Sequence, residues 1–155
     1  MSISPGLKAL LDESHVSYST VSHTTTYTAQ GTAAAMRISG KEMAKTLVLK
    51  AGDQTVLAVL PAAHHANLEA LSSVIGKTVR LATEPEFISL FPDCELGAMP
   101  PFGSLYNLPV YVDESLAADE EILFNAGTHR EAIRMKYLDF ERLAKPTICA
   151  FASKG

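Results

Sequence analysis

Short apolar stretches rich in β-branched residues, set close together along the chain, constrain this fold more than any other feature. Residues 46–50 and 55–60 are two such stretches, and only Ala51–Gln54 separates them, which predicts a β-hairpin. Further strands are expected over residues 16–21, 79–82, 108–112, 121–125 and 131–135. Parallel pairing of consecutive strands needs a long crossover, usually a helix, and few intervening segments can supply one. We therefore expect an α/β domain of the α+β type, with helices around a curved, mixed, largely antiparallel, barrel-like sheet.

Apolar spacing and capping residues predict the helices that surround this sheet. Asn67 and Gly76 are placed to cap one helix, and Thr83 and Glu86 have the form of a capping box at the start of another. Helices are expected over residues 5–15, 29–38, 67–75, 83–91 and 138–143. Turns are expected over residues 113–120 and 126–129.

Composition limits the classes of function. The 155 residues, 47% of them hydrophobic, fit a single domain over residues 1–155. With no long apolar run and no leader pattern, we expect a cytoplasmic protein with no membrane partner. A net charge of −4 argues against DNA and against nonspecific attraction to nucleic acid, but leaves room for a local basic site. Cys94 and Cys149 have no metal-binding spacing, so we expect no metal and no cofactor.

A stiff loop is the first candidate for a functional element. Residues 91–103 contain Pro100 and Pro101, which fix the backbone, and Gly97 and Gly103, which permit unusual conformations. Exposed N–H groups in such a loop can hold a substrate oxygen, although a tight corner between elements has the same composition.

Side chains that carry chemistry have competing interpretations. Lys45 is either a solvated residue at a strand start or an ammonium directed into a cleft, and His129 is either a surface residue or a ligand contact. His64 and His65 point to opposite sides of an extended chain, which disfavours a shared metal. Cys94 is either a nucleophile, with His129 as base, or a small semi-buried apolar residue. Serine hydrolase, zincin, P-loop and dinucleotide-binding motifs are missing from the sequence.

Several separated segments, in order, closely resemble the YbaK/EbsC family. That family comprises YbaK and ProX-like aminoacyl-tRNA deacylases and the editing insertion domain of bacterial prolyl-tRNA synthetases. The likeness runs from Tyr27 to about Leu143 and is carried by the segments Ala44–Val48, Ala58–Pro61, Val79–Thr83, Glu95–Gly103, Leu108–Ser115 and Asn125–His129.

The resemblance implies a free-standing enzyme that hydrolyses the ester between a wrongly attached small amino acid (Ala, Cys, Ser or Thr) and the terminal ribose of tRNA. It implies an essential role for Lys45 and a GxxxP loop, Gly97–Pro101, that lines the same pocket. From the chemistry of ester hydrolysis, we expect backbone N–H groups around Gly97 to stabilise the oxyanion. The substrate-binding residues that we expect beside them are Thr46, Ala98, Met99, Pro100, Pro101 and His129. Because some alanine-specific relatives have asparagine where this chain has Thr46, the amino acid removed cannot be inferred.

The expected partners are the acceptor end of aminoacylated tRNA and, for specificity, a synthetase or an elongation factor. Two other functions compete with this one. A noncatalytic member would bind aminoacylated ends or a synthetase without hydrolysis, and a cysteine-dependent esterase would use Cys94.

Overall fold

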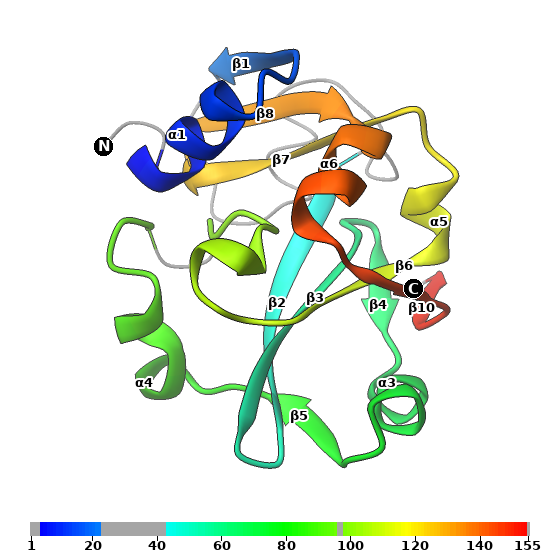
Figure 1. Cartoon of the computed structure of the whole chain (residues 1–155). Coiled ribbons are helices and arrows are strands. Elements are labelled where there is room, and N and C mark those ends of the chain that lie inside the picture. The colour runs from blue at the N-terminus through cyan, green and yellow to red at the C-terminus, as the bar shows by residue number, and fades with distance from the viewer. Residues whose placement is uncertain (1–3, 23–42, 96–97, 155) are drawn as a thin grey trace.

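A computed structural model of the chain describes residues 4–22, 43–95 and 98–154 (Figure 1). The strands form three sheets within these ranges. The largest has the order β5-β2-β3-β6-β9, with bounds Val79–Leu81, Ala44–Ala51, Gln54–Pro61, Val110–Asp113 and Thr147–Cys149. A second has the order β1-β8-β7, with bounds Tyr18–Ser22, Glu131–Lys136 and Glu121–Thr128. The third pairs β10 (Ala152–Lys154) with β4 (His64–Ala66).

The predicted hairpin is confirmed as β2 and β3, which pair antiparallel from Ala44 opposite Pro61 to Ala51 opposite Gln54. Both faces of this hairpin are covered, which explains why Val56–Leu60 is a continuous buried run rather than an alternating one. One face contributes Val48, Leu57 and Val59 to the larger core. The other contributes Leu49, Val56, Ala58 and Leu60 to a smaller core with Leu71 and Phe151.

Helices lie around these sheets (Figure 1). The α-helices have the bounds Pro5–Glu13 (α1), Leu68–Ile75 (α3), Glu84–Phe87 (α4), Glu114–Ala117 (α5) and Tyr137–Ala144 (α6). Short 3₁₀ segments have the bounds Ile88–Leu90 (η1) and Gly103–Leu105 (η2). Of the helices in the described ranges, none combines the length and the apolar character that a bilayer crossing requires. The helix expected over residues 29–38 lies outside the described residues.

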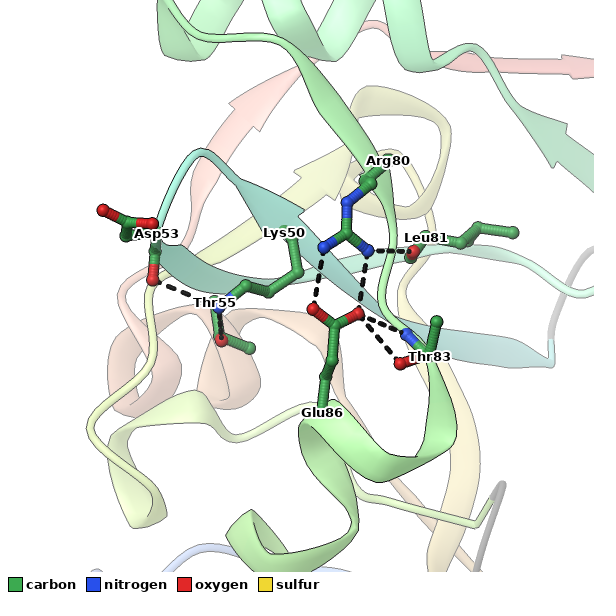
Figure 2. Close-up of polar contacts among 7 residues, drawn as sticks. All are labelled: Lys50, Asp53, Thr55, Arg80, Leu81, Thr83 and Glu86. Atoms are coloured by element: carbon green, nitrogen blue, oxygen red, sulfur yellow. Dashed lines mark hydrogen bonds and ion pairs between the residues drawn. The ribbon is translucent and has the colours of Figure 1, made fainter.

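The predicted caps are confirmed. Asn67 Oδ1 accepts a hydrogen bond from the N–H of Ala70 at 3.1 Å, and Gly76 ends α3 in the left-handed region with φ 85°. At the start of α4, one oxygen of the Glu86 carboxylate accepts from the N–H of Thr83 at 2.8 Å. Figure 2 shows Arg80 bound to both oxygens of the same carboxylate, at 2.8 and 2.7 Å. The capping box therefore also fastens α4 to β5.

Two predictions about the second half of the chain are wrong in detail. Residues 113–120 do not form a simple turn, because Asp113 caps α5 by accepting from the N–H of Ser115 at 3.0 Å. Of residues 126–129, only His129 lies in a turn, since β7 continues to Thr128 across a bulge in its pairing with β8. The mixed, largely antiparallel pairing is confirmed, because β3–β6 and β6–β9 are parallel and the other strand pairs are antiparallel. The strands form separate sheets and not a closed barrel.

Candidate active site

Lys45 is placed by the start of β2, where this strand reaches the neighbouring sheet. The carbonyl of Met43 accepts a hydrogen bond from the N–H of Ala62 at 2.7 Å, and Met43 forms an isolated parallel bridge with Leu123 of β7. Lys45 itself is partly buried, and burial lowers the pKa of its ammonium group. The structure therefore holds a partly desolvated cation two residues from the point where the chain reaches β7.

The Lys45 side chain lines a pocket of about 230 Å³ between β2, β4, α3 and β5. Its described lining residues are Lys45, Leu47, His65, Ala66, Leu68 and Leu81. Alternation along β2 directs Thr46 to the opposite face, which it shares with Ala44 and Val48. Lys45 and Thr46 thus belong to different sides of the strand.

The Pro/Gly loop is packed into the larger core. Ala98, Met99, Pro100 and Pro101 are all buried, and Met99 belongs to the core cluster that contains Ala44 and Val48. Gly97, the residue expected to act through its backbone, lies outside the described residues.

The loop is anchored on both sides of Gly97 by one residue of β7. The N–H of Glu95 donates to the carbonyl of Gly127 at 2.7 Å, and the N–H of Gly127 donates to the carbonyl of Ala98 at 2.9 Å. Gly127 has φ 92° and lies at the bulge, so that both of its backbone polar groups point to the loop. This anchor was not predicted, because only the fold brings Gly127 to the loop.

His129 lies beside the same anchor and is 4% exposed. Its backbone N–H donates to Oε1 of Glu95 at 2.9 Å. Hydrogen bonds from the side chain of Thr128 and from this N–H lower the pKa of Glu95, so the carboxylate is ionised at neutral pH. The structure therefore brings His129 and the loop together through Glu95, for which the sequence had indicated no role.

Cys94 lies next to this region in a polar cluster with Asp93 and Tyr106. Its sulfur is 3.4 Å from Oδ1 of Asp93 and 3.2 Å from the Tyr106 hydroxyl. Burial raises the pKa of the Cys94 thiol to about 12. Because the thiolate is the nucleophilic form, this environment argues against a cysteine-dependent esterase.

His64 and His65 line different pockets, as strand alternation predicts. His65 faces the pocket of Lys45, whereas His64 lines a pocket of about 520 Å³ that includes Asp113, Glu114 and Ser115.

Comparison with known proteins places the chain in a family. Residues 23–143 match the family model described as the aminoacyl-tRNA editing domain. The multifunctional Ser/Thr-tRNA deacylase ProXp-y of Escherichia coli strain K12 is 34% identical over 113 residues, which cover 70% of this chain and 68% of that protein.

Solved structures share the fold. The hypothetical protein APE2540 aligns with a TM-score of 0.86 and 18% identity, over 96% of this chain and 99% of its own. A proposed trans-editing enzyme for prolyl-tRNA synthetase aligns with a TM-score of 0.81 and 24% identity, over 98% and 99% of the two chains. The fold class and the family predicted from the sequence are confirmed, and the chain belongs to the aminoacyl-tRNA editing domain family.

Proposed function

We propose that this chain hydrolyses the ester that joins a small, wrongly attached amino acid to the terminal ribose of tRNA, with serine and threonine as the first substrates to test. The predicted enzyme class, an aminoacyl-tRNA deacylase, is supported by the family and confirmed by the named activity of the E. coli relative. Serine and threonine come first because that relative is a Ser/Thr-tRNA deacylase. Alanine and cysteine complete the class of small amino acids.

The observation that carries the proposed mechanism is the anchoring of the loop on Gly127. Ester hydrolysis needs a placed water and donors for the charge that develops on the carbonyl oxygen. Hydrogen bonds at Glu95 and Ala98 hold the chain on both sides of Gly97. An oxyanion site requires backbone N–H groups that need no reorganisation during the reaction, and fixed ends of the loop favour that property.

Lys45 supplies the positive charge in this mechanism. Its partial burial makes an ammonium group attract an anionic or carbonyl oxygen more strongly than a fully hydrated lysine would. We assign Lys45 to hold the carbonyl oxygen or a phosphate of the acceptor end, and the ribose 2′-hydroxyl to position the water. The other proposed substrate-binding residues lie away from the Lys45 pocket as the structure describes it. Thr46 is on the opposite face of β2 from Lys45, and the rest are the loop residues Ala98, Met99, Pro100 and Pro101, and His129.

Deacylation assays on tRNAs charged with alanine, serine, threonine, cysteine and proline test this function. Lys45→Ala should abolish release of the preferred amino acid. Lys50→Ala is the matched control, since Lys50 lies on the same strand but donates to the Asp53 carbonyl at 3.1 Å and to the Thr55 hydroxyl at 3.3 Å, as Figure 2 shows. Its activity should stay close to that of the parent.

Two outcomes would contradict the proposal in different ways. If the folded parent releases none of the amino acids above the spontaneous rate, the protein is a noncatalytic binding module. If Lys45→Ala is as active as Lys50→Ala, the deacylase stands but the role of Lys45 does not.

The proposed partner is the acceptor end of cytoplasmic aminoacyl-tRNA. An acidic protein gains little from nonspecific attraction to the tRNA backbone. We therefore propose that a synthetase or an elongation factor contributes to the choice of tRNA.

A further inference from the structure

We propose that His65 is a further substrate-binding residue, which together with Lys45 holds a phosphate of the tRNA acceptor end, while Leu47, Leu68 and Leu81 form an apolar wall for the adjoining nucleoside. The inference rests on the proposed function and names the part of the substrate that the Lys45 pocket receives.

The first support is that Lys45 and His65 reach one pocket from different sheets. Lys45 belongs to β2 of the five-stranded sheet, and His65 belongs to β4, which pairs with β10. His65 lies opposite Ser153 in that pairing, which fixes which face of β4 it occupies. An ammonium group has three donors, and an imidazole N–H adds another, so the pair can satisfy several oxygens of one phosphate.

The second support is the charge of the pocket. None of its described lining residues is acidic, although the whole chain has a net charge of −4. Three other pockets on the described surface each include at least one carboxylate. One pocket contains Glu95, another Asp113 and the third Glu121. An anion is therefore better placed in the Lys45 pocket than in these three.

The third support is the apolar wall. Leu81 is 57% exposed at the edge strand β5, and Leu47 and Leu68 are partly buried beside it. Apolar surface next to a cationic pair suits a nucleoside, because a ribose and a base have large uncharged faces. A pocket of about 230 Å³ is below the range of about 300–1,000 Å³ that is typical for whole ligands, which fits one end of a larger molecule.

The neighbouring histidine provides a control of matched chemistry. His64 precedes His65 on the same short strand, but it lines the pocket that contains Asp113 and Glu114. Replacing either histidine removes one imidazole from β4, and only His65→Gln removes it from the pocket of Lys45.

Steady-state deacylation kinetics of the parent, His65→Gln and His64→Gln give the first readout. We expect His65→Gln to raise KM for the charged tRNA by roughly three- to tenfold with kcat nearly unchanged. An increase of this size corresponds to the loss of one charge-assisted hydrogen bond at a partly solvated site. His64→Gln should match the parent, and equal urea midpoints would show that the variants fold alike.

A binding experiment separates this inference from the proposed function. Adenosine 5′-monophosphate, adenosine and inorganic phosphate are titrated into the parent while the imidazole NMR signals are followed, with His65→Gln used to assign them. We expect the monophosphate to shift the His65 signals at lower concentration than either fragment alone. An unchanged KM in His65→Gln, or a monophosphate that leaves His65 unaffected, would overturn the inference. A parent without deacylase activity would refute the proposed function, while the titration would still decide what the pocket binds.

Discussion

Gly127→Ala tests whether the loop depends on its anchor in β7. A Cβ atom at this position would lie 2.9 Å from Cβ of Ser4 and 3.3 Å from the Ser4 nitrogen. Ser4 cannot move away easily, because its N–H donates to the carbonyl of Ala126 at 2.9 Å and it caps α1. The substitution therefore strains the residue that holds both Glu95 and Ala98.

Two contributions set the expected magnitude. A residue other than glycine held at φ 92° costs about 1–3 kcal/mol of folding free energy. Contact with Ser4 adds a further cost of about 1–3 kcal/mol, as overpacking of a dense interior does. Gly76→Ala separates the two, since Gly76 has φ 85° with nothing within 4 Å of its Cβ position and carries only the first cost.

Urea unfolding and deacylation, measured on the same preparations, check this prediction. We expect Gly127→Ala to be destabilised by about 1–3 kcal/mol more than Gly76→Ala, because only Gly127→Ala carries the overpacking contribution. At a temperature where both variants are folded, Gly127→Ala should lose kcat, whereas Gly76→Ala, at the end of α3, should retain it. Equal destabilisation of the two variants, or full activity of folded Gly127→Ala, would refute the reasoning that this glycine positions the loop.

Two further predictions concern Asp113 and Cys94. Burial alone would raise the pKa of Asp113, but hydrogen bonds from Ser115, Phe151 and Ala152 outweigh burial and lower the pKa below the ordinary 3.8. The stability that the Asp113 carboxylate contributes is therefore present above pH 3.8 and is lost as the pH falls through the folded-state pKa. Asp113→Asn should therefore lower the free energy of unfolding by about 1–3 kcal/mol at pH 7 and show a weaker further loss in acid, as measured by urea midpoints from pH 7 to pH 3. An unchanged midpoint at pH 7 would contradict this prediction. Cys94→Ala should keep deacylase kcat within about twofold of the parent, because a thiol with a raised pKa is not a nucleophile, and a large loss of kcat with an unchanged urea midpoint would restore the cysteine mechanism.

Local chemistry explains which elements could be predicted from the sequence. The β2–β3 hairpin and the caps at Asn67 and Gly76 depend on residues close together in the chain, and all are present. Strands β4, β9 and β10 were not predicted, although β5 of the same length was, because three residues give little alternation to recognise. Their order comes from distant partners, such as Asp113, whose carboxylate accepts from the N–H groups of Phe151 and Ala152 at 2.8 Å.

The candidate site divides in the same way. Lys45 and the loop could be named in advance because the family resemblance attaches to contiguous motifs. Glu95 and Gly127 gained their roles only in the structure, where hydrogen bonds join segments that are far apart in the sequence. A Gly-Thr-His segment reads as a turn, yet here it ends a strand, because pairing with β8 overrides the local preference of Gly127.

The two adjacent histidines show the limit of sequence reasoning most clearly. Alternation predicts that His64 and His65 face opposite sides, and this holds, but alternation alone does not say which of them meets Lys45. The pairing of β4 with β10 makes that choice, because a shift of one residue in register would exchange the two faces. With the observed register, the pocket beside Lys45 receives His65, and the pocket beside Asp113 receives His64. A kinetic difference between His65→Gln and His64→Gln therefore tests the register of this short strand as well as the binding of a phosphate.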